Sequence, residues 1–285
     1  MGRLSRDKRD VFYRRAKEIG YRARSAFKLL QLDSEFHLFD GVTRAVDLCA
    51  APGSWSQVLA DRIPSTDEQP NIVAVDLQPM APIEGVLCLQ GDITSYDTAR
   101  DILKPFENNR RAELVVCDGA PDVTGLHDLD EYLQAQLLVM AVKITTHVLV
   151  DGGTFVAKIF RGRHAGHLYS QLRLLFDRVS VAKPTSSRNS SLESFVVCQG
   201  FKGGDISNLS LNSDDTILET SNLDKSVFPF LACGDLSGWN ETEFTVMDAD
   251  MSYPMSEDQY VAPVAPPILP PHHAQQNQGG GEMLL

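Results

Sequence analysis

The stretch VDLCAAPGSWSQVL, residues 46–59, predicts the fold of this chain. It begins as an apolar strand, passes through a turn of small residues, and continues as an amphipathic helix. Such a strand-to-helix turn often holds a nucleotide-like ligand. Gly53 is its single glycine, so it matches neither the three-glycine dinucleotide fingerprint nor a P-loop. The turn therefore favours a ligand without a phosphate, with an ordinary connection as the alternative.

Further apolar runs and helical patterns alternate along residues 25–203. The runs predict seven strands, at 45–49, 72–77, 86–92, 113–118, 154–160, 178–182 and 193–199. The runs at 72–77, 86–92 and 113–118 are continuously apolar, as in strands buried on both faces. Helical patterns occur at 25–36, 54–63, 129–149 and around 168–176. Asp151-Gly152-Gly153 is expected to be a turn before the fifth strand. The alternation predicts an α/β, Rossmann-like fold with a doubly wound, seven-stranded, mostly parallel sheet. The last strand pair is expected to be antiparallel, because its polar link has no helical pattern.

Charge divides the chain into three expected parts. The formal charge of −12 is carried by residues 204–285, which hold 13 Asp or Glu and one Lys, whereas residues 1–28 hold ten Lys or Arg and three acids. We expect 1–24 to be a basic RNA-binding arm with aromatic rings that stack on bases, or alternatively a solvated helix face. Residues 25–203 would be the catalytic domain. Residues 204–285 would be an acidic, mostly disordered tail, except for an apolar segment at 226–239 that docks on the domain or a partner.

The cysteines and the hydropathy pattern bear on the compartment. Five scattered cysteines form no CxxC pair, which indicates buried thiols in a reducing compartment. The charged first residues lack the apolar core of a signal peptide, and no run is long and apolar enough to span a membrane. We therefore expect no membrane partner and a cytoplasmic location, with the nucleus as the alternative.

Several predicted strands end in an acid, namely Asp47, Asp76, Asp92 and Asp118. The carboxyl ends of parallel strands meet at one crevice, so these acids should converge. Asp76 lies where an acid would bind ribose hydroxyls, and Asp92 could accept a hydrogen bond from an adenine amino group. Several acids without a phosphate cradle suit a cationic nucleoside, which predicts S-adenosylmethionine as cofactor and no metal. The alternative for any one of these acids is a helix cap or a solvated turn.

A second group of residues indicates chemistry rather than cofactor binding. Lys158 lies inside the apolar strand TFVAKIF, and burying an unpaired ammonium group is costly. Its natural partners are Asp118 and Glu193, and Lys28 lies on an otherwise apolar helix face. The cluster is either a structural ion-pair network or a catalytic set that orients and deprotonates a hydroxyl. The sequence leaves the protonation state of Lys158 open.

Five ordered motifs resemble those of the FtsJ/RrmJ family of RNA ribose 2'-O-methyltransferases: DLCAAPGSWSQVL, GDIT, VVCDGAPDVTG, TFVAKIF and KPTSSRNSSLES. The resemblance covers residues 1 to about 201. It implies a catalytic tetrad of Lys28, Asp118, Lys158 and Glu193. It also implies donor contacts from Gly53, Trp55, Asp76, Asp92 and Asp118, with Trp55 walling the pocket or, alternatively, serving as a plain core aromatic.

Details such as RGRHAGHLYSQL and the later CGDLSG are most similar to the family's eukaryotic tRNA anticodon-loop branch. That branch implies methylation of nucleotides 32 and 34 of tRNA and a helper protein that positions the substrate. Another RNA, ribosomal or messenger, is the alternative substrate. A nicotinamide-dependent oxidoreductase is disfavoured by the missing glycine fingerprint. A non-catalytic RNA-binding subunit is disfavoured because the tetrad is intact.

Overall fold

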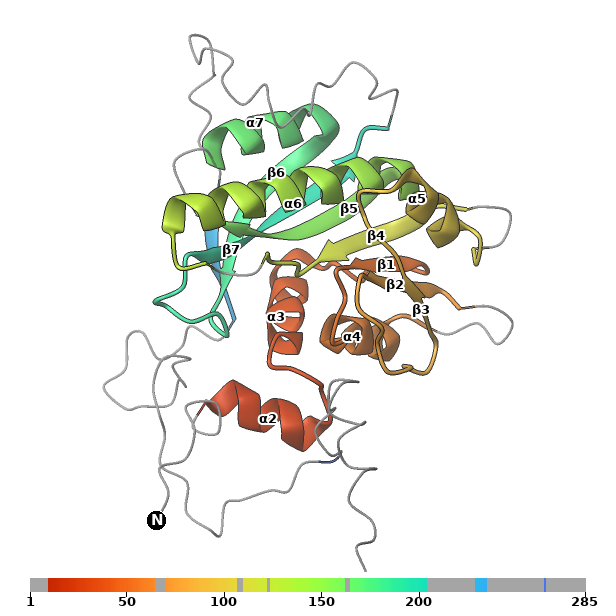
Figure 1. Cartoon of the computed structure of the whole chain (residues 1–285), viewed down its shortest axis with the longest axis horizontal. Helices are drawn as coiled ribbons and strands as arrows, with labels where there is room; N and C mark the ends of the chain where they lie inside the picture. Colours follow the sequence, from red (N-terminus) through yellow and green to blue (C-terminus); the bar gives the residue numbers. More distant parts are fainter. Residues whose placement is uncertain are drawn as a thin grey trace, which may run out of the picture.

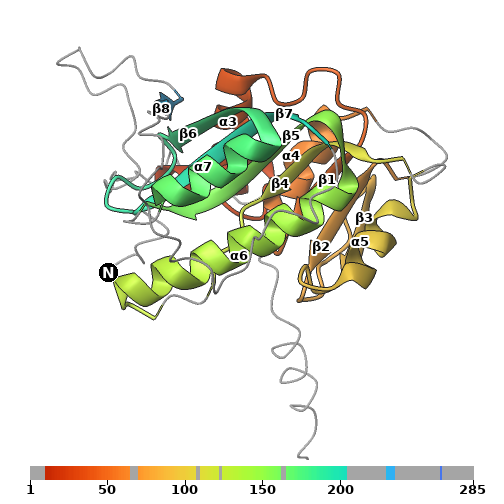
Figure 2. The same cartoon turned by 90° about the horizontal axis from the view of Figure 1, so that it is seen from above.

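The computed structural model describes residues 10–64, 70–106, 110–121, 124–161, 165–203, 229–234 and 264. One sheet of eight strands runs through its centre, in the order β3-β2-β1-β4-β5-β7-β6-β8. Helices α5, α6 and α7 cover one face of this sheet, and α3 and α4 cover the other (Figure 1, Figure 2). The arrangement is the α/β, doubly wound architecture that the alternating pattern predicts.

The elements are close to the predicted ones in position. The strands are β1 Ala45–Leu48, β2 Ile72–Asp76, β3 Val86–Gln90, β4 Ala112–Cys117, β5 Leu149–Phe160, β6 Phe176–Pro184, β7 Glu193–Phe201 and β8 Phe230–Cys233. The helices are α2 Val11–Ile19, α3 Ala26–Phe36, α4 Ser54–Arg62, α5 Tyr96–Leu103, α6 His127–Val148 and α7 Ala165–Leu175.

Strand direction follows from the connections. Strands β1 to β5 pair in parallel, since each is linked to the next by a crossover. The short polar link between β6 and β7 holds no helix, and the two strands pair antiparallel, which confirms that prediction. Strand β7 also inserts between β5 and β6, antiparallel to β5.

The sheet has eight strands where seven were predicted. Within the apolar segment 226–239, residues 229–234 lie against the sheet, and Phe230–Cys233 form β8, parallel to β6. Leu231 and Cys233 of β8 join the core beneath α3, so the added strand covers both an open sheet edge and apolar surface. Residues 226–228 and 235–239, like 204–225, lie outside the described residues.

The expected turn at Asp151-Gly152-Gly153 is wrong, because these residues lie inside β5. The register against β4 shifts between Ala112 and Leu114, whose partners are Leu149 and Thr154. Gly152 has φ +79°, a conformation that favours glycine, so the segment bulges without leaving the sheet.

Residues 10–24 of the expected arm pack onto the domain. Helix α2 buries Val11 and Ala16, and Asp10 caps its first turn by accepting a hydrogen bond from the Tyr13 amide at 3.0 Å. The Phe12 ring lies 5.6 Å from the Phe27 ring of α3, centroid to centroid. This aromatic side chain, expected to stack on bases, therefore takes part in the contact between α2 and α3. Residues 1–9 lie outside the described range.

Candidate active site

A cavity of about 920 Å³ lies at the carboxyl edge of the parallel strands. Asp76 ends β2, Asp92 follows β3 and Asp118 follows β4, and all three line the cavity. The parallel sheet therefore brings together three of the predicted donor contacts. Other walls come from the turn after β1 (Ala51 and Pro52), from Ile93 after β3, and from one side of α6 (Leu133, Leu137 and Met140).

Backbone amides hold two of these carboxylates in place. Oδ2 of Asp76 accepts a hydrogen bond from the Ala51 amide, and Oδ1 accepts one from the Gln78 amide, both at 2.8 Å. Oδ1 of Asp92 accepts one from the Thr94 amide, also at 2.8 Å. Each carboxylate oxygen has a further lone pair, so both groups can accept hydrogen bonds from a ligand's hydroxyl or amino groups.

Gly53, also expected to contact the donor, shapes the turn without lining the cavity. It caps α4 with φ +103°, and a Cβ there would lie 2.8 Å from Nη1 of Arg22. The same guanidinium donates hydrogen bonds to the backbone oxygens of Pro52, Ala81 and Pro82, at 2.8–2.9 Å. Gly53 thus leaves room for the arginine that clamps this turn.

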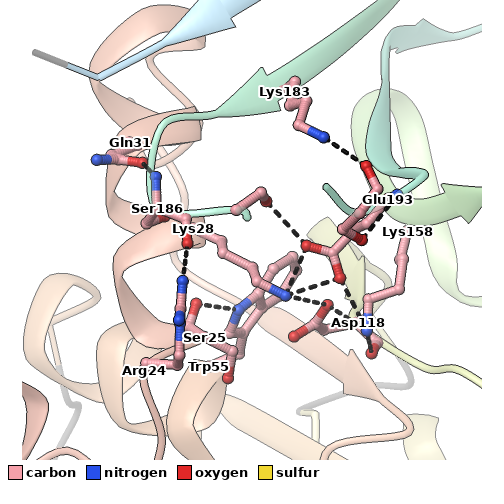
Figure 3. A network of polar contacts seen from close by, with 12 residues as sticks. Arg24, Ser25, Lys28, Gln31, Trp55, Asp118, Lys158, Lys183, Ser186 and Glu193 are labelled. Atoms are coloured by element: carbon pink, nitrogen blue, oxygen red, sulfur yellow. Dashed lines mark hydrogen bonds and ion pairs between the residues drawn. The ribbon is translucent and has the colours of Figure 1, made fainter. Parts of the chain in front are cut away.

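Trp55 does not wall the cavity as expected, because it lies in the core beneath α3 and is 2% exposed. Its Nε1 donates a hydrogen bond to the backbone oxygen of Ser25 at 2.8 Å, and its ring lies 5.6 Å from that of Phe195. Helical spacing in SWSQVL places it on the buried side of α4. Trp55 therefore joins α4 to the start of α3, behind the four charged residues described next (Figure 3).

Lys28, Asp118, Lys158 and Glu193 meet at one point, although four different segments carry them (Figure 3). Nζ of Lys158 lies 2.9 Å from Oδ1 of Asp118 and 3.7 Å from Oε2 of Glu193. Nζ of Lys28 lies 2.8 Å from Oε1 of Glu193 and 3.8 Å from Oδ1 of Asp118. The structure thus brings together all four residues of the predicted tetrad.

Burial and mutual attraction oppose each other in this cluster. Lys158 is 9% exposed, and burial alone would lower its pKa, but the charges of Asp118 and Glu193 outweigh burial and raise the pKa above its ordinary value. Burial would likewise raise the pKa of Glu193, but Lys28 and Lys158 hold it below its ordinary value. The free protein therefore carries Lys158 as an ammonium and Glu193 as a carboxylate at neutral pH.

Asp47 lies behind the cavity rather than in its wall. It is 1% exposed, and its Oδ2 accepts a hydrogen bond from Oγ of Ser56 at 2.5 Å, which links β1 to α4. Burial raises the pKa of Asp47 to about 7; the Ser56 hydrogen bond opposes this shift, and the negative charges of Asp118 and Asp76 add to it. This acid has a structural position, unlike the other three.

A second cavity, of about 280 Å³, adjoins the tetrad. Lys28 and Glu193 line it together with two arginines and three serines, namely Arg24, Arg188, Ser186, Ser187 and Ser191. Asp118 lines the larger cavity, so the tetrad lies at the junction of an acidic site and a basic one. The sequence signal for these serines is the motif KPTSSRNSS. The apolar wall from α6 was missed, because helical periodicity does not identify the residues that border a cavity.

The described residues offer neither a metal site nor a membrane-spanning helix. No group of three or more His, Cys, Asp or Glu within them is arranged to hold a metal ion. None of the helices in the same part of the chain is long and apolar enough to cross a membrane.

Known proteins resemble this chain over most of its length. The model of a family described as FtsJ-like methyltransferase matches residues 21–201. A tRNA (cytidine(32)/guanosine(34)-2'-O)-methyltransferase of Homo sapiens is 56% identical over 284 residues, 95% of this chain and 83% of the relative. The Schizosaccharomyces pombe protein of the same name is 55% identical and covers 95% of each chain. The crystal structure of a candidate ribosomal RNA methyltransferase from Plasmodium falciparum has TM-score 0.56 and 25% identity, over 65% of this chain and 100% of that chain.

Proposed function

The chain belongs to the FtsJ-like methyltransferase family, and we propose that it transfers a methyl group from S-adenosylmethionine to ribose 2'-hydroxyls of the tRNA anticodon loop, at position 32, position 34 or both. The relatives named for these two positions align with 95% of the chain. The observation that carries the proposal is the place of the tetrad. Asp118 faces the acidic cavity, Lys28 and Glu193 face the basic one, and Lys158 contacts both carboxylates.

The larger cavity has the chemistry that S-adenosylmethionine requires. Asp76 would accept hydrogen bonds from the ribose hydroxyls and Asp92 from the adenine amino group, while Leu133, Leu137 and Met140 offer an apolar wall for the base. Carboxylates also suit the cofactor's positive charge. When bound, S-adenosylmethionine supplies a methyl group made reactive by its bond to a positively charged sulfur.

Lys158 is equipped to stabilise the oxygen that takes up the methyl group. Its ammonium has three N–H donors, and two acceptors of Asp118, Oδ1 at 2.9 Å and the backbone oxygen at 2.7 Å, lie within hydrogen-bond distance. The nearest Glu193 oxygen, at 3.7 Å, is too far for a good hydrogen bond. The third donor can therefore point to a ribose 2'-oxygen, and the positive charge offsets the negative charge that grows there.

The hydroxyl proton must leave as the new carbon–oxygen bond forms. Lys158, being already protonated, does not accept it in that state. An ether oxygen that still carries its proton is a far stronger acid than any carboxylic acid. Late transfer to Asp118 or Glu193, the carboxylates beside Nζ, is therefore downhill even though the pKa of Glu193 lies below its ordinary value.

The smaller cavity suits the backbone of an RNA strand. Arg24, Lys28 and Arg188 supply positive charge, and the hydroxyls of Ser186 and Ser191 can donate to phosphate oxygens. In RNA, the 3'-phosphate is attached to the ribose carbon next to the 2'-hydroxyl. A hydroxyl placed at Lys158 therefore brings a phosphate close to the tetrad, on the side where these cations lie.

The test uses labelled S-adenosylmethionine and tRNA transcripts that carry 2'-deoxynucleotides at position 32, at position 34 or at both. We expect label to enter the unmodified transcript, to be lost wherever the acceptor hydroxyl is missing, and to be absent from the doubly substituted transcript. Nucleoside mass spectrometry identifies each product. Equal labelling of the doubly substituted transcript, or labelling of ribosomal RNA alone, would contradict the proposed substrate.

The proposal includes a helper protein that positions tRNA, and a cytoplasmic location. The same transcripts test the need for a helper. If the purified chain alone methylates both positions at rates that support repeated turnover, no helper is required. We expect slow or incomplete methylation by the chain alone.

A further inference from the structure

Strand β8 belongs to the acidic tail, residues 204–285, yet it ends beside the RNA side of the proposed site. It extends along the end of β6, with Val181 opposite Phe230 and Pro184 opposite Cys233. The Val181 amide donates to the Pro229 oxygen at 2.8 Å, and the Thr185 amide donates to the Cys233 oxygen at 2.7 Å. The second of these bonds extends past β6 to the first residue of the 185–191 loop. Figure 2 shows β8 at the outer edge of the sheet.

The first residues of that loop are fixed by Gln31 of α3. Nε2 of Gln31 donates to Oγ1 of Thr185, and Oε1 accepts from the Ser186 amide, both at 2.9 Å. The next residue, Ser187, donates from Oγ to Oε1 of Glu193 at 2.8 Å. Three successive loop residues therefore link β8 and α3 to the tetrad: Thr185 bonds β8, Ser186 bonds Gln31, and Ser187 bonds Glu193. Figure 3 shows the contact between Gln31 and Ser186 beside the tetrad.

Gly234, the residue after β8, lies close to the side chains of Gln31 and Thr185, which are hydrogen-bonded to each other. Gly234 has φ +114°, and a Cβ at this residue would collide with Oγ1 of Thr185 and lie 2.8 Å from Nε2 of Gln31. Just before it, Cys233 is 1% exposed and packed in the core beneath α3. Only glycine fits this position, and the buried cysteine keeps the strand in register.

We propose that β8 is a positioning element for the RNA side of the active site, because it holds the 185–191 loop against α3. Four residues of that loop line the smaller cavity, namely Ser186, Ser187, Arg188 and Ser191. Neither the loop nor β8 contributes to the lining of the larger cavity. The inference rests on the proposed function, which assigns the smaller cavity to RNA, and it separates RNA binding from donor binding.

The test substitutes Gly234→Ala in the full chain, with Gly41→Ala as the matched control. Gly41 also has a positive φ, +72°, but a Cβ there meets nothing within 4 Å, so the control carries backbone strain without the collision. For Gly234→Ala we expect faster hydrogen exchange at 185–191 and a rise of about tenfold in KM for tRNA, with unchanged affinity for S-adenosylmethionine. The control should match the wild-type chain in all three measurements.

A second pair of variants, with smaller changes, keeps the test valid if Gly234→Ala fails to fold. Thr185→Val removes the hydroxyl that accepts from Gln31, whereas Thr185→Ser keeps it. The valine variant should show the same changes in exchange and KM as Gly234→Ala, but smaller ones. The serine variant should behave like the wild-type chain. Unchanged exchange and KM in both Gly234→Ala and Thr185→Val, or an equal loss of donor affinity, would overturn the inference. A wild-type chain that labels ribosomal RNA and not tRNA would refute the proposed function instead. Hydrogen exchange at residues 185–191 would then be the measurement that decides whether β8 holds the loop.

Discussion

Lys158 is held twice by Asp118, through the carboxylate Oδ1 at 2.9 Å and through the backbone oxygen at 2.7 Å. Asp118 also lines the larger cavity, so the residue that borders the donor site fixes the position of the Lys158 ammonium. A methyl group and an acceptor oxygen must lie in line for displacement, and the geometry that places them accounts for much of the rate of such a reaction. Asp118 therefore contributes to the position of both the methyl donor, which it borders, and the acceptor oxygen, which Lys158 contacts.

Replacing Lys158 by methionine should remove methyl transfer while leaving the binding sites in place. Methionine fills similar space but carries no charge or donor, so we expect single-turnover rates to fall at least about 100-fold. Affinity for donor and tRNA should stay near wild type. Thermal melting of the same sample should show lost stability, about 3–5 kcal/mol when a buried partner is left unpaired.

The control is Lys202→Met, because Nζ of Lys202 donates to the backbone oxygen of Arg173 in an exposed contact. It should leave the rate unchanged. A folded Lys158→Met protein with substantial activity would reduce the cluster to a structural ion-pair network.

Asp76→Asn should weaken S-adenosylmethionine binding without affecting tRNA binding. In the wild-type chain the Asp76 carboxylate accepts hydrogen bonds from two backbone amides and faces the cavity. The asparagine side chain keeps one acceptor oxygen but lacks the negative charge and the second acceptor. Loss of a charged hydrogen bond predicts about 10–100-fold weaker binding in calorimetry. Asp97→Asn on α5 is the control, since its carboxylate pairs with Arg100 at the surface. Equal affinities would remove Asp76 from the donor site.

Trp55→Phe distinguishes the core position of this residue from the expected place in the cavity wall. Phenylalanine keeps a ring against Phe195 but removes the Nε1 donor, leaving the Ser25 oxygen without this partner. Stability should fall by about 1–3 kcal/mol in denaturant unfolding. Donor affinity should not change. A loss of affinity as large as that of Asp76→Asn would restore Trp55 to the donor site.

The tetrad could be predicted because each member has a local signal. Asp118 follows a strand, Glu193 opens one, and Lys158 interrupts an apolar run, so strand order brings these three to neighbouring positions. Lys28 interrupts the otherwise apolar face of a helix. Gly53 and Trp55 lie in the predicted turn and helix, but their contacts depend on Arg22 and Ser25, which are distant in sequence. Motif membership therefore identified the right segment, but it did not identify which side chains face the cavity.

Strand β8 depends even more on distant partners. The sequence predicts that an apolar segment of the tail docks, but it does not predict a strand there. Four of its residues form a strand because they pair with the open edge of β6 and pack beneath α3. The bulge at Gly152 has a similar cause. The two glycines indicate a turn, but Leu149 and Thr154 on either side of them pair with β4 and keep the segment in the sheet. Pairing partners outweigh local preference in both segments.

Arg188→Gln should weaken tRNA binding and reduce its salt dependence. Arg188 lines the smaller cavity, and its Nη2 lies 3.5 Å from Oδ2 of the buried Asp10. Because Asp10 already offsets part of its charge, we expect a modest loss, about two- to tenfold, with the salt slope lower by about one. Arg100→Gln, a surface change on α5, should have no effect. An unchanged slope would place the RNA backbone elsewhere.

Asp47→Asn should remove a pH dependence of stability that the wild-type chain carries. In the native state burial raises the pKa of Asp47 from an ordinary 3.8 to about 7, so between these values the unfolded chain binds fewer protons at this group than the folded chain does. The contribution of Asp47 to the free energy of unfolding therefore falls as pH rises from 3.8 to about 7. Asparagine does not titrate, and its side-chain oxygen can still accept the hydrogen bond from Ser56.

The stability of Asp47→Asn relative to wild type should thus rise from pH 5 to pH 7 and level off above it. A shift of this size predicts a total change of about 2–4 kcal/mol, measured as free energies of unfolding in denaturant. Glu193 does not mask the effect, because its lowered pKa costs stability only as pH falls below about 4.5. Asp97→Asn, an exposed carboxylate change, should give a flat difference over the same range. A flat difference for Asp47→Asn as well would mean that Asp47 is ionised in the native protein throughout, so that hydrogen bonding, rather than burial, determines its charge.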